Sequence, residues 1–184
     1  MTLSEIISLA LRQLDEDLAD VSEYDDLFRR YADEGCRIVM REYVKPRKRL
    51  RLETDENGRI SLEGLNIVRI VSLTAQDGRE RRYALSPDGK ALLTGEKSAT
   101  LEAVAEMEAP PLCRDADVPA FAPWAHSCLA DYICYRHLLS GSAAKQARAQ
   151  GYLSAFHQTA RRIRPEWMGS VTRLKNLYAA TGTQ

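Results

Sequence analysis

Three residues that could bind a metal ion or act as nucleophiles lie close together in the sequence: Cys128, Cys134 and His137. Cys134 and His137 are three residues apart, so a helix would place them on the same face. A closed zinc site takes four ligands, usually supplied as two close pairs, and no second pair accompanies these residues. Burial in helix packing is therefore the favoured interpretation, and we expect no metal site.

Cysteine catalysis would also require a general base and a third group that orients it. His126, His137 and His157 are candidates by residue type alone, because no local signature of a cysteine hydrolase surrounds any cysteine. The sequence contains no G-x-S-x-G, P-loop or G-x-G-x-x-G motif. We therefore expect no catalytic residue and no cofactor, and the protein is predicted not to be an enzyme.

A basic run stands out in a chain whose 26 basic and 26 acidic residues balance. The balance argues against a global attraction to nucleic acid or membrane, but a local patch can still act. One interpretation is a solvated strand edge or helix end, and the other is contact with DNA or with a neighbouring subunit. The candidate residues for the second interpretation are Lys45, Arg47, Lys48, Arg49 and Arg51.

The last 19 residues, 166–184, are too apolar for a solvated tail and too short for a domain. Apolar residues at a chain end usually dock, either on their own fold or on a partner. We predict a docking tail for another protein. Its candidate contact residues are Trp167, Met168, Val171, Leu174, Leu177 and Tyr178.

Apolar residues recur at helical spacing in four segments. Thr2 and Glu5 form a capping box for the first helix. Gly35 is expected to allow a close approach in the second helix. A stripe of Ala144, Ala147, Gly151 and Ala155 is expected to pack tightly in the fourth. The predicted helices span residues 3–18, 22–43, 123–139 and 142–163.

Between the second and third helices the pattern changes to alternation, which is typical of strands. Asn57-Gly58 predicts a hairpin that joins residues 49–54 to residues 60–62. Residues 67–73 are predicted to form a buried strand. Ser86 to Gly89 predicts a second turn, and alternating alanines predict a last strand over residues 99–105.

These elements predict an α+β protein in which both chain ends build a four-helix bundle and a small antiparallel β module is inserted between helices two and three. The predicted divisions are residues 1–45 with 110–165 for the bundle, 46–109 for the β module and 166–184 for the tail. The sequence has no signal peptide and no membrane-length apolar run, so we expect synthesis in a bacterial cytoplasm and no membrane contact.

Three stretches of the chain carry a resemblance. They are residues 2–17 (TLSEIISLALRQLDED), residues 129–137 (LADYICYRH) with Gly141, Lys145 and Gln146 after them, and residues 169–178 (GSVTRLKNLY). In this order they resemble the head–tail connector, or adaptor, proteins of tailed bacteriophages and of Firmicute prophages. The likeness spans nearly the whole chain.

The resemblance implies a structural virion protein of the phage neck, assembled as a ring, expected to have twelve copies, beneath the portal protein. It implies that the tail binds the portal and that the ring leads viral DNA, without sequence-specific binding, toward stopper or tail proteins. A DNA-binding regulator or packaging accessory that uses the basic patches remains the alternative.

Overall fold

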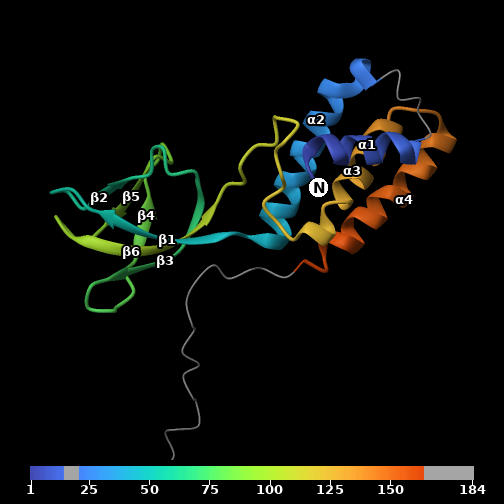
Figure 1. The fold of residues 1–184 in the computed structure, drawn as a ribbon. Helices are drawn as coiled ribbons and strands as arrows, with labels where there is room; N and C mark the ends of the chain where they lie inside the picture. Colours follow the sequence, from blue (N-terminus) through green and yellow to red (C-terminus); the bar gives the residue numbers. More distant parts are fainter. Residues whose placement is uncertain (15–20, 164–184) are drawn as a thin grey trace, which may run out of the picture.

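The computed structural model describes residues 1–14 and 21–163, and for residues 21–23 the backbone alone. It is an α+β fold with four helices and two small antiparallel sheets (Figure 1). The helices are α1 (Leu3–Leu14), α2 (Val21–Ile38), α3 (Cys128–Leu138) and α4 (Ala143–Ala160). A π-helical turn, η2 (Val39–Val44), extends α2, and a short 3-10 turn, η3 (Pro123–Ala125), precedes α3.

The start of α1 confirms the predicted capping box. The backbone N–H of Thr2 donates to Oε2 of Glu5 at 2.9 Å, and the N–H of Glu5 donates to Oγ1 of Thr2 at 3.3 Å. These bonds satisfy two backbone donors that a helix start leaves without partners.

The predicted four-helix bundle with one inserted β module is wrong. Helix α3 lies at the centre of the helical part and packs against α1, α2 and α4, whereas a regular bundle would give each helix two close neighbours. The reason is that α3 is apolar on nearly all sides, so a single buried face does not satisfy it. Its buried residues are Cys128, Leu129, Ala130, Tyr132, Ile133, Cys134 and Leu138.

The outermost helix, α4, packs on α3 through Ala149, Phe156 and Ala160. The small-residue stripe predicted to pack tightly does not do so, because Ala144, Ala147 and Gly151 are exposed. Gly35 of α2 is the true close contact, since a β-carbon there would lie 2.9 Å from Cδ1 of Tyr132.

The β part, which lies between α2 and α3 in the chain, contains two three-stranded sheets where the sequence predicted one module. The first sheet has the order β1-β6-β3, formed by Arg47–Glu53, Thr100–Met107 and Ile67–Ala75. The second has the order β2-β5-β4, formed by Arg59–Ser61, Ala91–Thr94 and Tyr83–Leu85. The β4–β5 turn and the last strand, β6, are confirmed.

The hairpin predicted at Asn57-Gly58 is wrong, although the turn is present. Gly58 has φ +74°, and the carboxylate of Asp55 accepts the backbone N–H groups of Asn57 and Arg59 at 2.8 and 2.7 Å. The strands on either side pair elsewhere, β1 with β6 and β2 with β5, so the turn carries the chain from one sheet to the other. A turn motif fixes a local bend but not the partners of its flanking strands.

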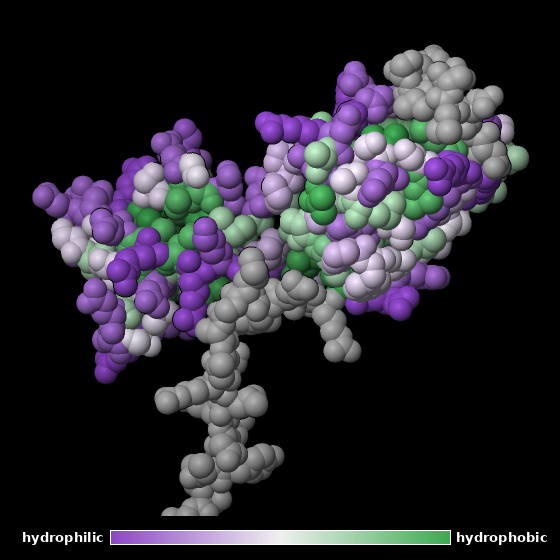
Figure 2. All heavy atoms as spheres, viewed as in Figure 1, coloured by the Kyte–Doolittle hydropathy of each residue, from purple (hydrophilic) through white to green (hydrophobic). Residues whose placement is uncertain are grey.

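The inner faces of the two sheets share one apolar core, which is separate from the helical core. Its buried residues are Leu52, Ile60, Ile70, Leu73, Leu92, Leu101, Ala103 and Ala105. Figure 1 shows the strands gathered on one side of the molecule and the helices on the other, linked by the segment that leads into β1 and by the segment that follows β6. Apolar residues are visible on the surface of both parts, among hydrophilic residues (Figure 2).

Candidate interaction surface

The basic run predicted from the sequence forms the edge strand β1 and the residue that leads into it. Lys45 ends the π-helical turn with φ +49°, and its backbone N–H donates to the carbonyl of Met40 at 2.7 Å. Pro46 then directs the chain into β1, which pairs with β6 alone. The sheet therefore presents one edge that carries four basic side chains: Arg47, Lys48, Arg49 and Arg51.

Strand alternation divides these cations between two directions. Arg47, Arg49 and Arg51 lie opposite Glu106, Val104 and Glu102 of β6 and share the outer face of the sheet. Lys48 points the other way and lines a hollow where the strands meet α2. Lys45, Lys48, Arg49 and Arg51 are exposed, and Arg47 is half-buried. The structure thus brings the five predicted residues onto one edge, but not onto one face.

Arg47 is engaged in a charge cluster across the sheet. Glu106 of β6, whose exposed fraction is only 7%, accepts hydrogen bonds from Nη2 of Arg47 at 3.3 Å and from Nε of Arg69 at 2.7 Å. The bonds from Arg69, and then those from Arg47, hold the pKa of Glu106 below its ordinary value. This cluster joins the three strands β1, β6 and β3. No local sequence pattern predicts it, because its three members lie in separate segments of the chain.

The basic residues of β1 also protect an exposed sheet edge from pairing with another strand. Unpaired backbone groups at a sheet edge invite another strand, and basic side chains discourage that pairing. The interpretation as a solvated strand edge therefore accounts for the position of β1. The exposed cations remain suited to phosphate or carboxylate groups that approach the edge from outside.

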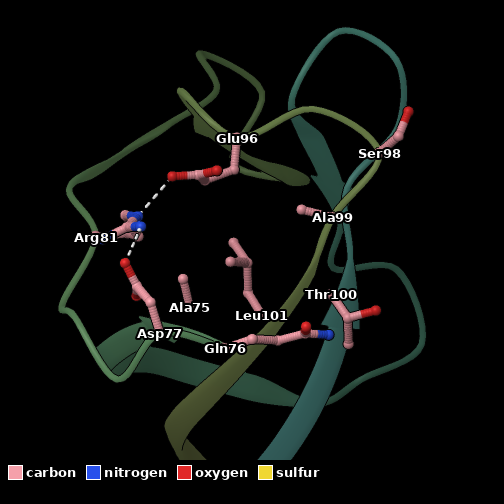
Figure 3. Close-up of a pocket in the computed structure, with 9 residues that line it drawn as sticks. All are labelled: Ala75, Gln76, Asp77, Arg81, Glu96, Ser98, Ala99, Thr100 and Leu101. Carbon is pink, nitrogen blue, oxygen red and sulfur yellow. Dashed lines mark hydrogen bonds and ion pairs between the residues drawn. The ribbon is translucent and has the colours of Figure 1, made fainter.

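A second charged cluster in the β part lies at the far end of its core. Nε of Arg81 donates to Oε1 of Glu96 at 2.5 Å, and its Nη2 donates to Oδ2 of Asp77 at 2.9 Å (Figure 3). The backbone N–H of Arg79, together with Arg81, lowers the pKa of Asp77. The hollow beside this cluster, about 460 Å³, also has Gln76 and Thr100 in its wall. Arg81 is thus bound to two carboxylates, and these ion pairs stabilise this end of the β part.

The thiols that suggested metal or nucleophile chemistry lie in the helical core. Burial raises the pKa of Cys36, Cys128 and Cys134 to about 12, so the nucleophilic thiolate is disfavoured. Sγ of Cys134 donates to Oε1 of Gln13 at 3.3 Å. Within residues 1–14 and 21–163, no group of three or more His, Cys, Asp or Glu side chains could hold a metal ion.

His137 and His126 also have packing partners. The ring of His137 makes edge contacts with the rings of Tyr24 and Phe28. His126 is fully buried, and its Nε2 donates to the carbonyl of Phe121 at 2.8 Å. These contacts give both histidines a structural role in the helical core.

The predicted tail residues, Trp167, Met168, Val171, Leu174, Leu177 and Tyr178, lie outside the described residues. The helix before them ends at Ala160, and Ile163 is buried against the helical core. In the part of the chain that is described, no helix has both the length and the apolar character needed to cross a membrane.

Neither comparison of the sequence identifies relatives. No protein-family model matches the chain, and a search of curated proteins finds no similar sequence.

Proposed function

We propose that the protein is a structural component of a phage neck: a head–tail adaptor that assembles as a ring beneath a portal protein and lines part of the DNA channel. The proposal draws on the resemblance of the three sequence stretches to the adaptor family. The structural observation that supports it best is the exposed basic edge formed by Lys45 and strand β1.

Cyclic symmetry would multiply the contacts that this basic edge makes with DNA. A ring repeats each surface once per subunit, so a few cations on one edge become a closed band of positive charge. Contacts with DNA phosphates are independent of sequence, which suits a channel through which any sequence must pass. A single subunit with zero net charge would bind DNA weakly, and the ring would gather the contacts.

The C-terminal segment has a role in the same proposal, as the part of the subunit that binds the portal. Residues 166–184 follow α4 and carry the apolar residues named above. A terminal segment that orders only on binding gives up part of its interaction energy, but it prevents premature assembly. We therefore expect free subunits to be monomeric or weakly associated, which light scattering measures directly.

The test mixes the full chain with the portal protein from the same genome and images the complex. A ring seated beneath the portal is the expected result. A variant that lacks residues 166–184 should fold and fail to co-purify with the portal. Co-purification of that shortened chain would show that the tail assignment is wrong.

The basic edge also favours a second candidate, a DNA-binding regulator or packaging accessory. A salt-dependent gel shift by the isolated monomer at physiological ionic strength would support that alternative over the adaptor. Charge reversal at Arg49 and Arg51 should abolish such a shift, and reversal of the exposed Arg12 on α1 together with Lys145 on α4 is the matched control.

A further inference from the structure

The chain passes from the helical part to the β part across a single residue, Lys45. Val44, the last residue of η2, is buried in the helical core. Pro46 already belongs to the sheet, because its carbonyl accepts the N–H of Met107 at 2.9 Å and extends the pairing of β1 with β6. Lys45 lies between them in the left-handed region, with φ +49°. This first crossing is therefore one residue long.

The chain returns to the helical part at a second crossing, which lies beside the first. The N–H of Glu108 donates to the carbonyl of Asn66 at 2.8 Å, so Glu108 still belongs to the β part. Ala109, the next residue, is buried in the helical core. The hydrogen bond at the start of β1 joins the two crossings, which are separated by about 5 Å, the distance between adjacent strands. Figure 1 shows both segments running between the two parts.

Few contacts join the helices to the strands in the described part of the chain. The pairs of elements in extensive contact there are helix with helix or strand with strand. A hollow of about 520 Å³ lies between the end of α2 and the sheet, with Arg37, Lys48 and Asn66 in its wall. One ion pair bridges it, since Nη1 of Arg37 donates to Oε1 of Glu108 at 3.2 Å, with both side chains about half exposed. An exposed ion pair stabilises one orientation only weakly.

We propose that the β part, residues 46–108, swings about the line through the two crossings and so opens and closes the hollow beside α2. Each part keeps its own core during this motion. The backbone change falls on Lys45 and on the peptide between Glu108 and Ala109, as in hinges where a few residues absorb the change in φ and ψ. The inference stands apart from the adaptor proposal, because its test uses the free subunit without a portal.

The length of β1 sets the size of the displacement. The strand has seven residues, so its far end lies about 23 Å from the crossings. A swing of roughly 15° would move that end by about 6 Å.

Two spin labels measure the swing in the full chain, by pulsed electron paramagnetic resonance. One label uses the native Cys113 of the helical part, which is exposed, whereas Cys36, Cys128 and Cys134 are buried. The other label is attached in the β part after Arg79→Cys, at the turn that follows β3, where the native side chain is 82% exposed.

A reference pair within the β part gives the width of the distance distribution without a swing. It combines Arg79→Cys with Glu56→Cys, another exposed turn position, and Cys113→Ser removes the native site. We expect the distribution between Cys113 and position 79 to be wider than the reference, by about the displacement given above. Equal widths would overturn the proposal.

Substitution at the first crossing tests the position of the pivot. Lys45→Gly frees the backbone there and should widen the distribution further. Lys45→Ala and Ser98→Gly are the controls. The alanine variant removes the same charge but keeps a β-carbon, and Ser98 also has a positive φ, +46°, but lies within the β part. Equal widths in the three variants would contradict a pivot at Lys45.

Removal of the bridging ion pair provides an independent measurement. Glu108→Gln should widen the distribution between the two parts, because the charge that restrains Arg37 is lost. Glu63→Gln is the matched control, since Glu63 forms an exposed ion pair with Lys90 at 3.3 Å within the β part. An unchanged distribution in Glu108→Gln, or the same change in both variants, would refute a hinge that this ion pair restrains.

Discussion

Gly35 of α2 faces the aromatic ring of Tyr132 of α3, and a β-carbon at Gly35 would lie 2.9 Å from Cδ1 and 3.0 Å from Cγ of that ring. Tyr132 is 4% exposed and packs against Phe156 with ring centroids 5.0 Å apart, so it has little room to move. This close contact between α2 and α3 therefore depends on the absence of a side chain at Gly35.

Gly35→Ala should lower the free energy of unfolding by about 1–2 kcal/mol, because the clash outweighs the gain in helix propensity. Gly151→Ala in α4 is the matched control. A β-carbon there meets no atom within 4 Å, so stability should rise by about 0.5–1 kcal/mol. Urea unfolding of both variants measures the pair, and equal effects of the two substitutions would contradict the packing argument.

Glu106→Gln should destabilise the β part by about 1–3 kcal/mol at neutral pH, because it removes the charge that Arg47 and Arg69 share. The folded-state pKa of Glu106 lies below its unfolded value. Its stabilising effect is therefore full above the unfolded pKa and is lost as the pH falls through the folded pKa. Chemical unfolding at pH 7 and pH 3 should show the difference between variant and wild type shrinking at the lower pH.

Asp131→Asn should act in the opposite direction. Burial raises the pKa of Asp131 to about 6, against the weaker effect of the hydrogen bond from Gln13. The folded state thus favours the protonated form, and its stability falls as the pH rises from the unfolded pKa to about 6. Asn should raise the free energy of unfolding at pH 7 by about 1 kcal/mol after solvent screening. Thermal melts below pH 4 should show no gain, and a gain that persists there would refute the ionisation argument.

Replacing Arg49 and Arg51 together with Val should promote self-association, because β1 would become an apolar edge strand with free backbone groups. Size-exclusion chromatography coupled to light scattering should detect dimers or larger species. Arg12→Val with Lys145→Val is the control, since it removes the same charge from exposed helix positions. A monomeric Arg49/Arg51 variant would show that the basic residues are not needed to protect this edge.

The sequence predicted local structure more successfully than strand partners. The Thr2–Glu5 capping box and the turn before Ala91 depend on residues close in the chain, and both are confirmed. The pairing of β1 with β6 joins Arg47 to Glu106, across 59 residues, and no local pattern encodes it. Residues 67–73 form a strand as predicted, but the prediction that the strand is buried is wrong at Val68 and Val71, which are 50% and 37% exposed. An apolar edge strand and a buried strand have the same composition, so the sequence does not distinguish them.

The predicted arrangement of the helices was wrong for a different reason. Helical spacing was expected to bury one face of each helix, but α3 is surrounded by three helices, and residues on all its sides are buried. The candidate site was predicted only in part. The Lys45–Arg51 run was identifiable from composition, whereas the engagement of Arg47 depends on Glu106, far away in the sequence.

Two chain crossings link the strands to the helices: one leaves through η2, which extends α2, and the other returns beside the last two turns of α2. One passes through the left-handed Lys45 into β1. The other returns after β6, where Nη1 of Arg37 donates to Oε1 of Glu108 at 3.2 Å and the N–H of Leu112 donates to Oδ1 of Asp33 at 2.9 Å. Two separate connections limit rotation of the sheets about either one, and the α2 residues that hold the second connection, Asp33 and Arg37, flank the Gly35 that contacts Tyr132.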